Sequence, residues 1–217
     1  MHGSEGQERQ CWRCDTPVGA GLVCPRCEAP QPLPPGSDLF AVLGLPRKLV
    51  LDGNDLERRY HMRSRALHPD RHQTGEARAR ELSEKGSAVL NRAYRTLRDP
   101  VARGRYWLEL HGNPLHVDNT EVPAALAADV FDAQEKLEEL RTSSTPELRD
   151  QVTGMRDALA ARLRALKDDL SGLYAGANGD GQLGELKRRL SEIAYLRTLL
   201  GDIEAALGDG RGADSRH

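Results

Sequence analysis

The stretch RALHPDRHQ, residues 65–73, decides how the sequence around it is interpreted. A helical pattern runs into it, and Pro69 ends that helix because proline disfavours helix at the preceding residue and has no N–H to donate. His68, Asp70 and His72 surround the proline. Such side chains suit a metal site, a catalytic acid–base pair or a surface that contacts another protein.

Two amphipathic helices flank this turn. The first is expected to open at about Asp55, with Asp52 or Asn54 as its N-cap, and to run to the proline. The second is expected over roughly 76–97, with Val89 on its apolar stripe, and Pro100 then starts a new element. Two such helices with a short connection pack antiparallel to bury their apolar faces. The expected buried face of the first helix is Leu56, Tyr60 and Leu67.

Residues 120–207 contain three leucine-striped helices, which predict a three-helix bundle. The first is expected over about 123–141. The second begins with Thr145 as N-cap and Pro146 in the first helical position. It ends at the glycine-rich stretch AGANGDGQ, residues 175–182, and the third helix follows. Phe131 lies off the apolar stripe of the first helix, and Tyr195 and Leu199 lie off that of the third, so these side chains are expected to be exposed.

Composition points to an all-α protein, and the lack of catalytic motifs predicts that it is not an enzyme. Charged residues make up 29% of the chain, aromatic residues 4%, and the net charge is −2, so nothing global calls for nucleic acid or an anionic membrane. No apolar run approaches the ~20 residues that span a bilayer. Strand-like alternation is weak, and the sequence has no glycine-rich phosphate loop or nucleophile elbow. The start, MHGSEGQERQ, has no secretory or transit pattern, which predicts an intracellular, cytoplasmic protein, or a mitochondrial one in a eukaryotic host.

Two CxxC pairs, separated by nine residues, predict a small metal-binding module. Four thiolates suit a closed, tetrahedral, structural zinc site, whose binding energy would fold a segment too short to bury a core. Two disulfides, a redox pair and an iron–sulfur cluster are the alternatives. The expected zinc ligands are Cys11, Cys14, Cys24 and Cys27.

The HPD turn, residues 68–70, is open to several interpretations when taken alone. Side chains at 68, 70 and 72 around a proline do not converge easily on one ion, and no second group of carboxylates supports an enzyme site. A solvent-exposed turn without function is the plainest interpretation of the tripeptide by itself. Its position between a helix of about a dozen residues with a basic outer face and a longer second helix favours a docking surface.

The wider sequence resembles the HscB-type J-domain co-chaperones, which serve iron–sulfur cluster assembly. The resemblance covers residues 38–207, and some members of the family also have an N-terminal double-CxxC module. The segments that carry it are DLFAVLGLPRKLVLDGNDLERRYHMRSRALHPDRH, residues 38–72, and GSAVLNRAYRTLRDPVARGRYWLELHG, residues 86–112. Arg63 stands where the family prefers an apolar residue, and we expect its charged end to extend to water.

The resemblance implies two protein partners. A J domain stimulates ATP hydrolysis by a DnaK- or HscA-type heat-shock chaperone, and the C-terminal bundle of the family binds an IscU-type scaffold. The implied chaperone-binding residues are His68, Pro69, Asp70, Arg58, His61 and Arg65. The implied scaffold-binding residues are Ala127, Ala128, Phe131, Asp132, Glu135, Glu139 and Tyr195. The family generally has bulky apolar residues in place of the two alanines.

These inferences predict an all-α chain with four parts. Residues 1–36 form a zinc-ribbon-like module and a proline-rich linker, 37–111 a J-domain helical hairpin, 112–207 a scaffold-binding three-helix bundle and 208–217 a disordered tail. The expected function is that of a co-chaperone. A general J-protein that delivers unfolded clients, and a nucleic-acid-binding zinc ribbon using Arg9, Arg13 and Arg26, are the alternatives.

Overall fold

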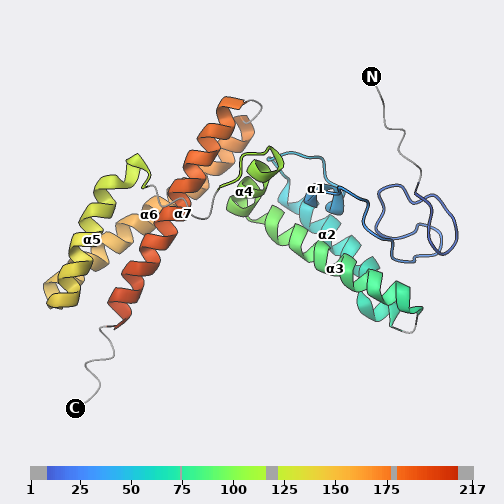
Figure 1. Cartoon of the computed structure of the whole chain (residues 1–217), viewed down its shortest axis with the longest axis horizontal. Helices are drawn as coiled ribbons and strands as arrows, with labels where there is room; N and C mark the ends of the chain where they lie inside the picture. The colour runs from blue at the N-terminus through green and yellow to red at the C-terminus, as the bar shows by residue number, and fades with distance from the viewer. Residues whose placement is uncertain (1–8, 74, 116–121, 177–179, 210–217) are drawn as a thin grey trace, which may run out of the picture. The chain divides into compact units, whose positions relative to one another are not determined.

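The computed structural model describes residues 9–73, 75–115, 122–176 and 180–209 (Figure 1). Within these ranges the regular structure is helical, and the only strand-like pairing is two isolated bridges in the N-terminal segment. The all-α prediction is therefore confirmed. The chain divides into two compact units, residues 1–103 and 104–217. No helix in the described ranges is both long and apolar enough to cross a bilayer.

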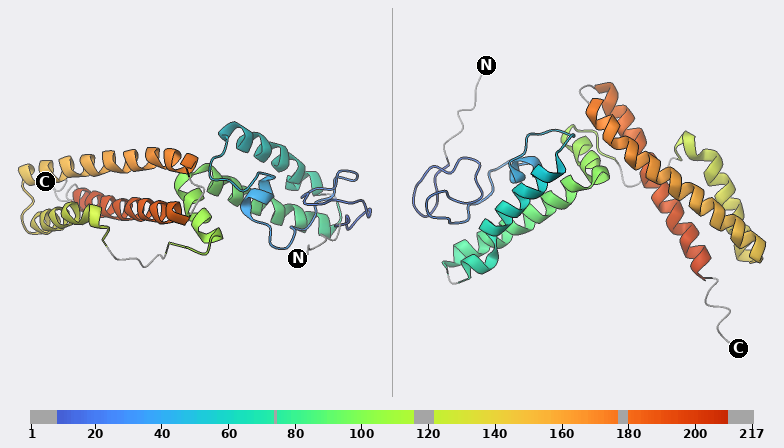
Figure 2. Two further views of the ribbon diagram at one scale, coloured as in Figure 1. Left: turned by 90° about the horizontal axis from the view of Figure 1, so that it is seen from above. Right: turned by 180° about the vertical axis from the view of Figure 1, so that it is seen from behind.

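The first unit is organised around a helical hairpin. Helix α1 covers Leu39–Leu43, α2 covers Gly53–Leu67, and a single 3-10 turn, η1, covers Pro69–His72. Helix α3, Ala77–Arg98, returns antiparallel to α2 (Figures 1 and 2). The Asp52 carboxylate accepts a hydrogen bond from the backbone N–H of Asn54 at 2.9 Å, which confirms Asp52 as the N-cap of α2.

The two hairpin helices approach closely because α3 has small residues where it meets α2. A Cβ atom added to Gly86 would lie 3.2 Å from a methyl group of Leu67. The rings of Tyr60 and Tyr94 stack with centroids 4.1 Å apart. Leu90, rather than the expected Val89, lies at the buried centre of the face. The buried residues of α3 are Ala79, Ser83, Gly86, Leu90, Ala93 and Leu97.

Helix α1 was not predicted, and it explains the arginine at position 63. The Arg63 Nη1 donates to the carbonyl of Val42 at 3.1 Å, and Arg59 donates to the carbonyl of Gly44. The last carbonyls of a helix have no partner within it. Arg63 satisfies one of them, so the expectation that its guanidinium extends to water was wrong.

The second unit contains the three-helix bundle. Helix α4, Pro100–Leu110, leads into this unit, and a 3-10 turn, η2, Ala124–Leu126, precedes the bundle. Helices α5, Ala127–Thr142, α6, Pro146–Gly176, and α7, Asp180–Asp209, then pack together, with α6 and α7 side by side (Figure 2). Because α7 runs through Asp209, only residues 210–217 of the expected tail lie outside the described residues.

The bundle core follows the leucine stripes. The Thr145 hydroxyl accepts a hydrogen bond from the N–H of Leu148 at 3.2 Å, which confirms the predicted N-cap of α6. Leu199 is only 6% exposed, so its predicted exposure was wrong: the apolar face of α7 is wide enough to bury neighbouring positions. The fully buried residues include Leu126, Leu170, Leu186, Leu190, Ile193 and Leu196.

Candidate docking sites and metal centre

The HPD turn presents polar side chains from a fixed backbone. His68 has extended dihedral angles, as expected for a residue before proline, and its Nδ1 accepts a hydrogen bond from the N–H of Asp70 at 3.3 Å. The side chains of His68 and Asp70 are 55% and 72% exposed, and their ring nitrogen and carboxylate lie 3.5 Å apart. Both groups are therefore accessible to a protein partner.

Hydrogen bonds from α3 anchor this turn. The carbonyl of Leu67 accepts from the Ser83 hydroxyl at 2.6 Å and from the Ser87 hydroxyl at 3.0 Å. This carbonyl is buried at the end of α2, where the helix has no further N–H groups to donate to it. The two serine hydroxyls replace those donors. The turn is thus held at its base while the ends of its side chains remain in water.

The outer face of α2 is exposed along its length, as a docking role requires. Arg58, His61 and Arg65 are all exposed. Arg58 forms an ion pair with Asp55, and His61 lies 3.5 Å from the carboxylate of Glu57. Arg65 has no ion pair among the described residues, so it offers the least compensated positive charge on this face.

A second exposed surface lies on α5. Phe131 is 71% exposed, which confirms that this aromatic side chain faces solvent. Ala127, Ala128 and Glu135 lie three or four positions from Phe131 and therefore on its side of the helix. Asp132 and Glu139 lie at the edge of this group. Tyr195 is half-buried on α7, and α5 packs against α7. The exposed residues around Phe131, here called the α5 patch, are Ala127, Ala128, Asp132, Glu135 and Glu139.

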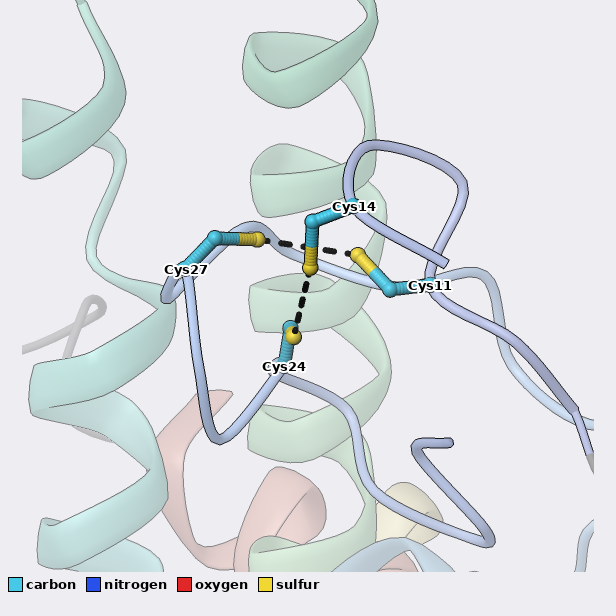
Figure 3. Close-up of side chains that lie close together, drawn as sticks. All are labelled: Cys11, Cys14, Cys24 and Cys27. Atoms are coloured by element: carbon cyan, nitrogen blue, oxygen red, sulfur yellow. Dashed lines mark hydrogen bonds between the residues drawn. The ribbon is translucent and has the colours of Figure 1, made fainter. Parts of the chain in front are cut away.

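The four cysteines converge on one point (Figure 3). Their sulfur atoms all lie within 4.8 Å of one another, with Cys11–Cys27 and Cys14–Cys24 each at 3.6 Å. Sulfur atoms around a tetrahedral ion with bonds of about 2.3 Å lie about 3.8 Å apart. The arrangement therefore fits one metal ion, and the four thiols are free of disulfides.

Hydrogen-bond donors surround the sulfurs and favour the charged thiolates that bind metal. The backbone N–H groups of Arg13 and Arg26 donate to Cys11 and Cys24 at 3.4 Å. The buried amide of Gln31 donates to Cys11 at 3.2 Å and to the carbonyl of Ala29 at 2.8 Å. Such donors orient and stabilise metal-bound thiolates.

The pKa values of the thiols move in opposite directions. Hydrogen bonds with the side chain and backbone of Thr16 lower the pKa of the Cys14 thiol to about 6, which favours its thiolate form. The N–H of Ala29 lowers the pKa of Cys27, but burial and the three neighbouring sulfurs outweigh it and raise that pKa to about 12. Four crowded thiolates therefore need a cation to be charged together.

Arg9 and Trp12 donate hydrogen bonds to backbone carbonyls within the module. Arg9 donates to the carbonyls of Gly19 and Pro32. The indole N–H of Trp12 donates to the carbonyl of Pro30 at 2.7 Å. These contacts occupy Arg9, one of the three arginines that the nucleic-acid alternative would use, and leave Arg26 exposed.

Gln31 was not singled out from sequence, because a glutamine four residues beyond the last cysteine carries no motif. The ion pair between Glu28 and Arg71, at 2.8 Å, was missed for a different reason. No local pattern connects residues 43 positions apart.

Comparisons with known proteins agree with this architecture. The chain is 32% identical over 195 residues to the human iron–sulfur cluster co-chaperone protein HscB, covering 88% of this chain and 79% of that relative. It is 33% identical over 134 residues to a co-chaperone HscB homologue of Bordetella avium, covering 60% and 80%. No protein-family model matches the chain.

Solved structures show the same likeness. The crystal structure of human co-chaperone protein HscB superposes with a TM-score of 0.68 at 26% identity, covering 91% of this chain and 98% of that structure. HscB from Vibrio cholerae shares the fold, with a TM-score of 0.55. A helical hairpin with an exposed HPD turn, followed by a three-helix bundle, is the architecture of a J-domain co-chaperone.

The chain belongs to the HscB family of iron–sulfur cluster co-chaperones. This finding confirms the resemblance seen in the sequence. The N-terminal four-cysteine cluster adds a site suited to one metal ion.

Proposed function

We propose that this protein stimulates ATP hydrolysis by a DnaK- or HscA-type heat-shock chaperone through its HPD turn, without catalysing a reaction itself. The observation that carries the proposal is the exposure of His68 and Asp70 on an anchored backbone. Asp70 can accept a charge-assisted hydrogen bond from an arginine of the chaperone. Arg58, His61 and Arg65 then steer an acidic chaperone surface to the turn.

The bundle supplies the second half of the proposed function. We infer that the α5 patch, with Tyr195, binds an IscU-type scaffold on which iron–sulfur clusters are built. An exposed aromatic side chain surrounded by polar residues is typical of a protein-binding surface. Phe131 is such a residue, and the exposed carboxylates of Asp132, Glu135 and Glu139 lie around it. The chain would then present the scaffold to the chaperone.

The metal of the four-cysteine cluster is proposed to be zinc, in a closed structural site. Four cysteine ligands leave no open position for catalysis, and zinc favours tetrahedral sulfur coordination. Native mass spectrometry of the purified protein would identify the ion, and iron in its place would overturn this assignment. A cytoplasmic location, or a mitochondrial one in a eukaryotic host, is part of the same proposal.

An ATPase assay tests the chaperone proposal. Asp70→Asn removes the carboxylate charge while keeping the shape of the side chain, so the rate of ATP hydrolysis by the chaperone should fall to its unstimulated level. Glu84→Gln, at an exposed position of α3, is the matched control and should stimulate fully. Full stimulation by the Asp70 variant would contradict the role of the turn. A chain that stimulates the chaperone but does not bind the scaffold would instead be a general J-protein.

A further inference from the structure

The metal-binding module is built from one turn used twice. The N–H of Cys11 donates to the carbonyl of Thr16 at 2.8 Å, and the N–H of Cys24 donates to that of Ala29 at 2.9 Å. In each turn the residue after the second cysteine has a positive φ, +55° at Asp15 and +56° at Glu28. The two positions are therefore structurally equivalent.

A glutamate at this position is conformationally unfavourable. The left-handed region suits glycine, and asparagine and aspartate tolerate it because their short polar side chains bond locally. Glu28 has no such compensation within its own turn. A residue kept in a sparsely populated backbone region at a surface position suggests a role for its side chain.

The Glu28 carboxylate reaches the residue beside the HPD turn. Its Oε2 lies 2.8 Å from a guanidinium nitrogen of Arg71, which directly follows Asp70. Arg71 also donates to the carbonyl of Arg65 at 3.5 Å, at the end of α2. The ion pair therefore links the module to the turn. Asp15, the equivalent residue, has no side-chain hydrogen bond or ion pair among the described residues.

Two further contacts join the module to the other side of the turn. Arg13 lies 3.4 Å from the carboxylate of Glu76, and the guanidinium of Arg78 lies 4.9 Å from the centre of the Trp12 ring. Glu76 occupies the N-cap position of α3 without a side-chain capping hydrogen bond, and Arg78 lies in the first turn of that helix. Exposed contacts of this kind are individually weak. Together, across a short intramolecular connection, they reinforce one another.

We propose that Glu28 is a positioning residue for the HPD turn, and that metal in the four-cysteine cluster keeps it in place. This proposal rests on the proposed function of the turn. With metal bound, the turn of residues 24–29 has a fixed shape, and Glu28 holds Arg71. Without metal, the few buried side chains of the module cannot maintain that shape. The HPD turn then loses the Glu28–Arg71 ion pair, which is here called the brace. A less ordered turn binds a chaperone more weakly, because only a fraction of molecules is ready to bind.

Hydrogen exchange of the full-length protein tests the brace without a chaperone. Removal of zinc with a chelator should speed exchange of the amides of residues 70–73 roughly 2- to 5-fold, as expected for loss of a surface contact. Zinc-loaded Glu28→Gln should show the same change. Asp15→Asn, at the equivalent position of the first turn, is the matched control and should leave these amides unchanged. Exchange that is the same with and without zinc, or in the Glu28 variant, would overturn the proposal.

Glu28→Gly separates positioning from folding of the module. Glycine relieves the unfavourable backbone conformation, so zinc should be held at least as tightly as in the wild type. The ion pair is absent, so the amides of residues 70–73 should still exchange as fast as in Glu28→Gln. Wild-type exchange in this variant would show that the carboxylate does not hold the turn.

The chaperone assay then shows whether the brace matters for function. Glu28→Gln should raise the concentration for half-maximal stimulation about 2- to 5-fold and leave the maximal rate unchanged. An unchanged half-maximal concentration would overturn the proposal. A wild-type chain that stimulates no chaperone would refute the proposed function, while the exchange experiment would still decide whether Glu28 holds the turn.

Discussion

The HPD turn and the α5 patch are two exposed surfaces built in opposite ways. The turn is a short irregular segment whose polar side chains stand on a backbone fixed by two serine hydroxyls. The α5 patch lies on a regular helix, where one large aromatic side chain, Phe131, is surrounded by alanines and carboxylates. The turn depends on an anchored backbone, whereas the patch depends on one side chain.

This difference predicts how each surface fails. A docking turn loses function when its charge is removed or its anchor is loosened, because its geometry decides which partner group it meets. A patch on a stable helix loses affinity when its aromatic side chain is truncated, while the fold stays intact. The following substitutions test this contrast, from the largest expected effect to the smallest.

The serine anchor should give the largest effect on stability. Ser83→Ala with Ser87→Ala leaves the buried carbonyl of Leu67 without either side-chain donor, at a cost of about 1–3 kcal/mol. Native-state hydrogen exchange of α3 amides measures the loss. Ser87→Ala alone keeps the shorter bond and should cost less. Equal stability of the double variant and the wild type would show that the turn is not anchored in this way.

Truncation of the exposed aromatic should weaken scaffold binding without unfolding the bundle. Phe131→Ala should cost about 2 kcal/mol of binding free energy, which is about 30-fold in the dissociation constant. Because Phe131 is 71% exposed, thermal unfolding should be unchanged. Calorimetric titration with an IscU-type scaffold measures the affinity. Wild-type binding by this variant would remove the α5 patch from the proposal.

Enlarging an alanine of the α5 patch should increase affinity for the scaffold. Ala128→Leu places a larger apolar side chain on the same side of α5, and burial of the added surface in the complex should contribute up to about 1 kcal/mol, or about 5-fold in affinity. Calorimetric titration with an IscU-type scaffold measures this gain. Gly154→Ala, at an exposed position of α6, is a control for general effects of added apolar surface.

The smallest effect is expected on the basic face of α2. Arg65→Gln should slow association with the chaperone about 2- to 3-fold at low salt, since long-range steering acts mainly on the association rate. The difference should vanish at high salt, where exposed charges are screened. Stopped-flow association at two salt concentrations measures it, and a deficit that persists in high salt would show a direct contact instead of steering.

Sequence patterns located both surfaces because each depends on local chemistry. Proline geometry placed the HPD turn after Leu67, and helical periodicity placed Phe131 off the apolar stripe. Four cysteines in two CxxC pairs predicted a convergence that the structure confirms. The N-caps Asp52 and Thr145 could also be predicted, because a capping side chain accepts from a backbone N–H no more than three residues away.

Contacts between distant segments could not be predicted from sequence patterns. Arg63 looked like a misplaced charge on an apolar stripe, because the five-residue helix α1, whose carbonyl it meets, was too short to predict. Leu199 seemed to lie off the stripe because a helix packed between two others buries a wider face than one stripe. The pair of Glu28 and Arg71 required the packing of the whole module, which periodicity does not describe.

Complementation between two defective variants tests the central claim that one chain joins scaffold to chaperone. Asp70→Asn should hold the scaffold but fail to stimulate, and Phe131→Ala should stimulate but bind the scaffold weakly. The quantity to measure is the additional rate of ATP hydrolysis that the scaffold causes. We predict that an equimolar mixture of the two variants does not restore it, because both surfaces must lie on the same molecule. Restoration to the wild-type rate would contradict the account.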